Sequence, residues 1–478
     1  MSQPTNVPTG ATQTSSAPPA SAGTTGAPTL GGRTTNASAV AGRTAILPTT
    51  SVPTVAGRLG EASASFRRAM AGTPGRMRIL ALLAVVVSLL FAVAAFSTFG
   101  STDDALRRGG DNATQLVRIQ AIHTSLVRAD ADATNSFLVG GLEPADQRTD
   151  YTTSLTQASR LIAEAARAQP ADGPALGALN GSVLTYASLI EQARATNRQA
   201  LPVGASYLKV ASSGLRSDAL PILDALVKAN QARVTAEFDG AAGSSAALIA
   251  SGVLALIVLI GGMVWLSLRT HRYVNPPLAV ATAAVLVTLV AGSISLGAIS
   301  SRVDDVRNGS YAATLATATA RIAAFDAKSN ESLTLIARGS GSAFEKAWVS
   351  SSNIVTAQSA EASRLSDDAA RLDAARMGEL WRAYVKTHKE IRAADDGGHW
   401  DVAVGQAIGK DPTSANAIFD AFDADSGAVL TSSSRAATDS LDSPRSWLPF
   451  ASWLGLLVGV AAAASAWWGV SLRLEEYR

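Results

Sequence analysis

Residues 79–101 read ILALLAVVVSLLFAVAAFSTFGS, a run of apolar and small residues that contains no Asp, Glu, Lys or Arg. A helix that crosses the hydrocarbon core of a bilayer needs about 20 such residues. Three further windows of similar length also lack charged residues: 240–268, 273–301 and 446–472. The sequence therefore predicts four transmembrane helices, at residues 76–101, 243–268, 277–300 and 446–472.

The composition of the whole chain agrees with a membrane protein and excludes several kinds of chemistry. Of its 478 residues 47% are hydrophobic and only 16% are charged, whereas about a quarter of a typical soluble chain is charged. The absence of cysteine excludes disulfides, thiol catalysis and cysteine-ligated metal centres. No Walker loop, metalloprotease, nucleophile-elbow or kinase signature occurs in the sequence. We therefore expect no enzymatic activity, no cofactor, no metal and no nucleic-acid partner.

The distribution of basic residues predicts the orientation in the membrane. The segments outside the two long regions between spans contain eleven arginines and three glutamates, whereas residues 103–242 contain 13 basic and 15 acidic residues and residues 302–445 contain 16 and 20. Because basic residues near spans remain in the cytoplasm, we expect both termini to be cytoplasmic. Candidate contacts for anionic lipid or a cytosolic partner are Arg67, Arg68, Arg76, Arg78, Arg269 and Arg272.

The remaining segments differ sharply in composition. Residues 1–75, rich in Ser, Thr, Pro, Ala and Gly, predict a disordered cytoplasmic tail. Residues 269–276 predict a cytoplasmic turn, and residues 473–478 a short cytoplasmic end. The two long regions, 102–242 and 301–445, have equal membrane context and share a weak pattern, with DADATNSFLVGG at 130–141 and DAKSNESLTLIARGSG at 326–341. Their order and length suggest an internal repeat.

Each long region is expected to form an extracytoplasmic four-helix bundle, so that the fold class is all-α. Apolar residues recur in steps of three and four, as in Leu116, Ile119, Leu126, Ala133 and Phe137. Gly- and Pro-containing breaks divide the first region at 140–144, 169–174 and 201–204, and Pro221 is expected to kink the fourth helix. In the second region we expect breaks at 339–341, near residue 372, at 395–399 and at 411–412.

His123 and Asp130 lie one heptad apart and allow two interpretations. If the apolar stripe keeps a period of seven, both residues lie on it and mark a ligand pocket or a packing layer that can switch. If the stripe drifts to Ile122 and Ala129, both polar residues lie at the edge of the bundle. We favour the drift, because an ideal helix slips by about 20° per heptad.

Two other polar groups have simpler interpretations. His388 and His399 match no standard zinc spacing, which favours a polar helix end. Asp420, Asp423 and Asp425 lack the other positions of a calcium loop, which favours a solvated acidic face.

A bundle between two spans, with a first helix that ends in DADATNSFLVGG, resembles the sensor domain of methyl-accepting chemotaxis receptors. The tandem arrangement, the basic tail and DAKSNESLTLIARGSG resemble actinobacterial four-span membrane proteins, the GlnX-like relay components between a glutamate-binding lipoprotein and a serine/threonine kinase. This resemblance implies a multi-pass sensor of the inner (plasma) membrane that signals to a separate cytosolic partner, with an extracytoplasmic solute-binding protein, a cytosolic kinase and a homodimer as implied interactions. The alternatives are a structural envelope protein and an accessory subunit of a transporter.

Overall fold

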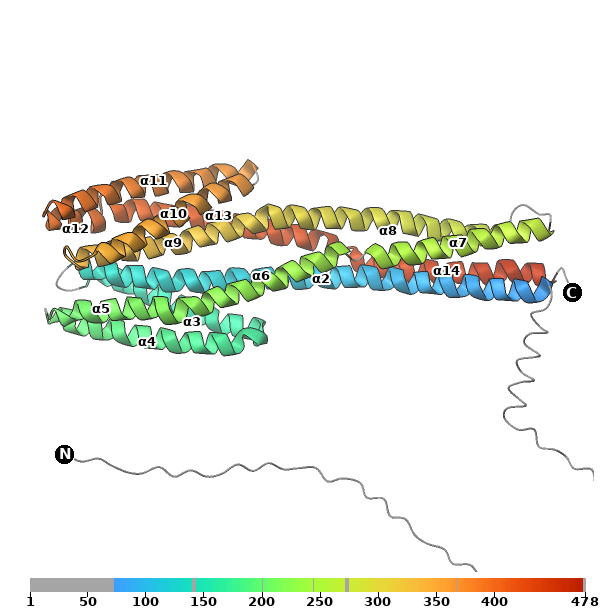
Figure 1. The fold of residues 1–478 in the computed structure, drawn as a ribbon, viewed down its shortest axis with the longest axis horizontal. Coiled ribbons are helices and arrows are strands. Elements are labelled where there is room, and N and C mark those ends of the chain that lie inside the picture. The colour runs from blue at the N-terminus through green and yellow to red at the C-terminus, as the bar shows by residue number, and fades with distance from the viewer. Residues whose placement is uncertain are drawn as a thin grey trace, which may run out of the picture. The chain divides into compact units, whose positions relative to one another are not determined.

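The computed structural model describes residues 73–139, 143–199, 201–243, 245–270, 275–366 and 368–475. The described residues form helices joined by short connections and contain no strand, which confirms the all-α class (Figure 1). The tail predicted over residues 1–75 lies almost entirely outside this described part of the chain, as do Arg67, Arg68 and Arg272.

Four helices carry the apolar segments: α2 (Thr73–Leu138), α7 (Ser245–Thr270), α8 (Pro276–Asn308) and α14 (Leu448–Glu475). Each is long and apolar enough to cross a membrane. Large apolar side chains such as Leu82, Ile257 and Ile294 project outward from these helices, as is expected where lipid is the surrounding solvent. The chain is therefore a membrane protein with four candidate spans.

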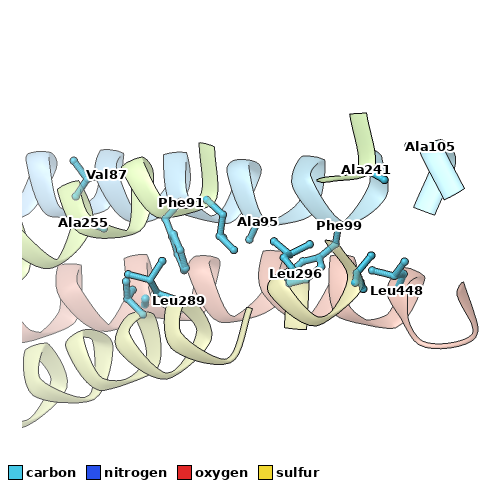
Figure 2. Packing of buried hydrophobic residues seen from close by; sticks show 14 of the residues in the cluster. Val87, Phe91, Ala95, Phe99, Ala105, Ala241, Ala255, Leu289, Leu296 and Leu448 are labelled. Carbon is cyan, nitrogen blue, oxygen red and sulfur yellow. The ribbon is translucent and has the colours of Figure 1, made fainter. Parts of the chain in front are cut away.

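Small residues allow the four apolar helices to pack closely, as the chemistry of lipid-embedded helices requires. A Cβ atom added to Gly459 of α14 would lie 2.4 Å from the Cβ of Ala92 on α2. Phe91 and Leu289 belong to the apolar cluster that these helices bury between them (Figure 2). A Cβ atom added to Gly261 of α7 would have no neighbouring atom within 4 Å. Close packing between the spans therefore does not require a glycine at this position.

The first bundle is built from the second half of α2, α3 (Ala145–Ala168), α4 (Gly173–Arg198) and a fourth rod. This rod comprises α5 (Val203–Gly214), the π-helical turn η2 (Leu215–Ala219) and α6 (Leu220–Gly243), and a 3-10 turn, η1 (Pro170–Asp172), precedes α4. Where a kink at Pro221 was expected, the π-helical turn lies just before the proline and the helix continues. The wider turn accommodates a residue that cannot donate a backbone hydrogen bond.

The second bundle is built from α9 (Ser310–Ile336), α10 (Ser342–Leu365), α11 (Asp368–Asp396) and α13 (Ala415–Arg445), with the short α12 (Trp400–Ile408) before α13. The expected break near residue 372 was misplaced. Helix α10 ends at Leu365, Ser366 is extended, and α11 already begins at Asp368. Asp368 is an acidic residue at the start of α11, a position where negative charge stabilises a helix. The helix therefore begins at Asp368 and continues through residue 372.

The two bundles pack against each other through α2 and α9 (Figure 1). One side of α2, with Ile122 and Ala129, faces the core of the first bundle. Another side, with Val127 and Ala131, contributes to the core of the second bundle. The surface between them is called the inter-bundle seam below; α2, α3, α5 and η2 form it on one side, and α9 and α13 on the other.

Candidate functional site

Both predicted polar residues of α2 are buried at the inter-bundle seam. The apolar stripe drifts as favoured, because Ile122 and Ala129 are completely buried in the core of the first bundle. His123 and Asp130 lie at the edge of that bundle, yet only 7% and 1% of their surfaces are exposed. The second bundle covers this edge, which the analysis of a single bundle could not foresee. Burial lowers the pKa of His123 to about 4, so its imidazole is neutral at neutral pH.

Asp130 is the centre of a hydrogen-bond cluster that joins three helices of the first bundle to the second. Its Oδ1 accepts hydrogen bonds from the hydroxyl of Ser212 (2.6 Å) and from that of Tyr186 (3.3 Å). Its Oδ2 accepts from the hydroxyl of Ser329 on α9 (2.6 Å) and from Nη1 of Arg216 (3.0 Å). A buried carboxylate with four donors is well compensated for its lost hydration.

Arg216 connects the two bundles directly. It lies on the π-helical turn η2, and its Nε and Nη2 lie 2.9 and 2.8 Å from Oδ1 of Asp326 on α9. The same guanidinium therefore binds one aspartate from each bundle. Burial opposes the charge of Arg216, but the two carboxylates outweigh this effect and raise its pKa. The planar guanidinium can serve two carboxylates at once, which a lysine cannot do with the same geometry.

Asp130 and Asp326 are the first residues of the two stretches that the suggested repeat aligns, DADATNSFLVGG and DAKSNESLTLIARGSG. In the structure these stretches lie next to each other across the seam, with Ser329 donating to Asp130. A further ion pair crosses the seam where Arg128 of α2 meets Asp423 of α13, and Arg321 binds the same aspartate at 2.5 Å. Charged groups thus hold the two bundles together at several points.

A cavity of about 670 Å³ lies in the seam, and Ala131 and Asp132, which follow Asp130 on α2, are part of its wall. It is lined by α2, α3, α9, α13 and the segment before α13, and eight of its twenty lining residues are charged. Asp420 and Asp423 belong to this wall, whereas Asp425 pairs with Arg376. The expectation of a solvated acidic face is wrong for Asp423, which is half-buried between Arg128 and Arg321, whereas Asp420 is exposed on the wall of the cavity.

A buried polar chain extends from the cavity into the second bundle. Lys328 lines the cavity, and its Nζ lies 3.8 Å from Oε1 of Glu331. Oε2 of Glu331 lies 2.7 Å from Nδ1 of His388, whose ring stacks on Trp348 at 3.5 Å. Burial opposes the protonation of His388, but its contacts with Glu331 and Glu345 raise the pKa. The expectation of a polar helix end is wrong for His388, because its side chain lies inside the bundle.

The arginines that were expected to face the cytoplasm lie far from the seam. Arg76 and Arg78 are exposed near the start of α2, and Arg269 is exposed at the end of α7. Figure 1 shows that the start of α2, the end of α7 and the end of α14 lie at one end of the membrane helices, opposite the bundles. In the part of the chain that the structure describes, no group of three or more His, Asp or Glu side chains is placed to hold a metal ion.

Sequence analysis did not identify Arg216, Asp326, Lys328 or Glu331 as functional candidates. The available signal was the polar run DAKSNES in the middle of a helix, where the bundle pattern requires apolar residues on one face. A helix that is polar on a face expected to be buried indicates either a polar core or a second contact surface. Both are present here.

Comparison with known proteins finds a similarity for the first bundle. The family model described as actinobacterial sensor domain matches residues 105–239, which run from the middle of α2 to the end region of α6. The second bundle lies outside this match. Neither the comparison with curated proteins nor that with solved structures found a match. Residues 105–239 thus resemble an actinobacterial sensor domain, and the chain that carries them has a sensing or signalling role at a membrane.

Proposed function

We propose that the protein is a transmembrane sensor that passes a signal from its two bundles, outside the cell, to a separate cytosolic protein. One observation carries the proposal: α2 runs without interruption for 66 residues, from the first apolar segment into the core of the first bundle and the inter-bundle seam. Such a helix is about 100 Å long at 1.5 Å per residue. A displacement at the seam is therefore transmitted to the membrane segment by a single rigid element.

The inter-bundle seam supplies the part that can change. A signal needs two arrangements of similar free energy and an input that binds them with different affinity. The ion pairs of Arg216 with Asp326 and of Arg128 with Asp423 join the bundles through groups that solvent or a ligand can replace. They supplement the apolar contacts that Val127 and Ala131 make with the second bundle. We infer that the two bundles move relative to each other and that α2 carries the motion.

The proposed orientation rests on charge. Arg76, Arg78 and Arg269 lie at the end of the spans that is opposite the bundles, and basic residues near spans favour the cytoplasmic side. The resemblance to GlnX-like components and to chemotaxis receptors suggests an extracytoplasmic solute-binding protein as input and a serine/threonine kinase as output.

Thiol labelling tests the orientation, because the native chain contains no cysteine. Single cysteines replace the exposed residues Arg160 and Ala360 in the bundles and Arg269 at the other end. We expect a membrane-impermeant maleimide to label the first two in intact cells and the third only after permeabilisation. Labelling of Arg269→Cys in intact cells would reverse the orientation and refute the proposal.

Disulfide formation between spans tests the relay. The rings of Phe96 in α2 and Trp453 in α14 lie 5.2 Å apart, so a cysteine pair at these positions reports on the packing of the spans. We expect Arg216→Ala, which breaks the seam, to change the rate of cross-linking in native membranes. Arg160→Ala, which removes an exposed ion pair of α3, is the matched control. Equal rates in both variants would show that the seam and the spans are not coupled.

A further inference from the structure

The cavity of the inter-bundle seam contains more negative than positive charge. Of its basic residues, Arg128 pairs with Asp423 and Lys410 with Asp146. Three more aspartates, Asp132, Asp150 and Asp420, line the same cavity. Among the residues that the structure describes, none of these three forms an ion pair, although Asp132 accepts a hydrogen bond from Ser154 at 3.3 Å. The cavity therefore brings five aspartates together with only three basic side chains, and Asp150 and Asp420 are exposed on its wall.

The pKa values of Asp132 and Asp420 reflect these surroundings. Burial raises the pKa of Asp132 to about 7. The charge of Arg128 opposes this shift, and the neighbouring carboxylates of Asp150 and Asp420 add to it. Burial likewise raises the pKa of Asp420. A cationic group placed among the three aspartates would stabilise their ionised forms.

Lys328 is an unsatisfied donor on the wall of the same cavity. Only 5% of its surface is exposed, and its Nζ has no hydrogen-bond acceptor. The nearest carboxylate, that of Glu331, is 3.8 Å away, and the aromatic rings of Tyr384 and Phe419 are 5.5 Å away. A buried ammonium group without an acceptor is costly. An acceptor oxygen of a bound molecule would give this ammonium group a hydrogen-bond partner.

Two acceptors of the first bundle on the same wall also lack a donor from the protein. The side-chain oxygens Oδ1 of Asn135 and Oε1 of Gln147 are buried without a donor, and both residues line the cavity. The amide group of Asn135 donates across the seam to Asn416 at 3.4 Å. The wall thus offers a cationic donor from the second bundle together with carboxylates and amide oxygens, most of them from the first.

We propose that the inter-bundle cavity binds a small amino acid with a basic side chain. Its ammonium or guanidinium groups would be compensated by Asp132, Asp150 and Asp420, and its carboxylate by Lys328. A diamine would leave Lys328 without an acceptor, and a dicarboxylate would be repelled by the aspartates. The volume lies within the range of about 300–1,000 Å³ that is typical of small-molecule sites.

This assignment rests on the proposed sensing function and names its input. A ligand in the cavity touches Asp132 and Asp150 of the first bundle and Lys328 and Asp420 of the second. It therefore binds only when the two bundles are at the correct separation, and by linkage it stabilises that separation. Lys328 also lies next to the Glu331–His388 pair. A ligand carboxylate bound to Lys328 therefore changes the balance of charge inside the second bundle.

Isothermal titration calorimetry on the full-length protein in lipid nanodiscs tests the assignment. The probes are L-arginine and L-lysine, with cadaverine as an amine without a carboxylate and glutarate as a dicarboxylate without an amine. We expect saturable binding of the two amino acids and no binding of the other two compounds. In Lys328→Gln and in Asp132→Asn the dissociation constant should rise about ten- to hundredfold, the loss expected for one hydrogen bond between charged groups. Lys386→Gln, at an exposed position of α11, should bind like the wild type.

The two variants also distinguish a binding site from a structural role. Asp132→Asn removes a carboxyl group whose pKa is raised by burial, so we expect the variant to bind more weakly while its melting temperature stays equal or rises. If Lys328→Gln fails to elute as a folded protein in size-exclusion chromatography, Asp420→Asn takes its place. Equal binding of cadaverine, unchanged affinity in Asp132→Asn, or no binding of either amino acid would each overturn the assignment. The cross-linking assay for the relay does not depend on these ligands, so the two failures can be told apart.

Discussion

Replacing Asp130 by Asn is the most direct test of the inter-bundle seam. Asn has nearly the same size, but it loses the charge and exchanges one acceptor oxygen for a donor. Asp130 accepts four hydrogen bonds, one of them from the guanidinium of Arg216 at 3.0 Å. A hydrogen bond to a charged group contributes about 1.5–3 kcal/mol to stability, and a donor left facing the new amide NH₂ group costs about 1 kcal/mol more. We therefore expect a loss of about 2–4 kcal/mol.

Thermal unfolding of the full-length protein in detergent, followed by far-UV circular dichroism, measures this loss. This loss of free energy corresponds to a fall of roughly 5–10 °C in the melting temperature. Asp132→Asn is the matched control: Asp132 lies on the same helix two residues away, but it accepts one hydrogen bond, from Ser154, and burial raises its pKa. We expect it to leave the melting temperature unchanged or higher at pH 8. A loss of stability that is equal in both variants would refute the assignment of Asp130 as the centre of the seam.

Three further measurements follow from the structure. The folded protein keeps the proton of Asp132 up to about pH 7, whereas the unfolded chain loses it near pH 4. The contribution of protonated Asp132 to stability is therefore complete below about pH 4 and is lost as the pH rises towards 7. Over that interval the melting temperature of the wild type should fall relative to that of Asp132→Asn. Glu331→Gln removes the buried partner of His388 at 2.7 Å and should cost about 3–5 kcal/mol, and a melting temperature like that of the wild type would show that the pair is not formed. Gly459→Ala places a Cβ 2.4 Å from α2 and should cost about 1–3 kcal/mol in stability towards detergent, whereas Gly261→Ala, with no neighbour within 4 Å, should have no effect.

Several elements of the fold were predictable because their signals are local. The four apolar segments could be recognised by length and by the absence of charge, since nothing else in a chain requires about 20 uncharged apolar residues. Gly or Pro residues mark the breaks after Leu138, Ala168 and Arg198, because these residue types restrict or free the backbone at their own positions. The break near residue 372 was misplaced because it rested on apolar spacing alone, without a Gly or Pro to mark the turn.

The seam was not predictable from the same signals. His123 and Asp130 were predicted at the edge of the first bundle, yet both are buried, because the sequence of one bundle does not say what packs against it. Arg216 is separated from Asp326 by 110 positions, and no local pattern relates an arginine on a π-helical turn to an aspartate in another bundle.

The sequence by itself determined the class of the protein: helical, with four apolar segments and two polar regions of similar length between them. These properties depend on hydropathy and charge, which are additive along the chain. The tertiary structure alone decided that the two polar regions share a buried surface, that Arg216 holds an aspartate from each, and that Asp132 and Lys328 face one cavity. Such contacts depend on the distance between groups that are far apart in sequence, and this distance exists only once both bundles have folded and packed together.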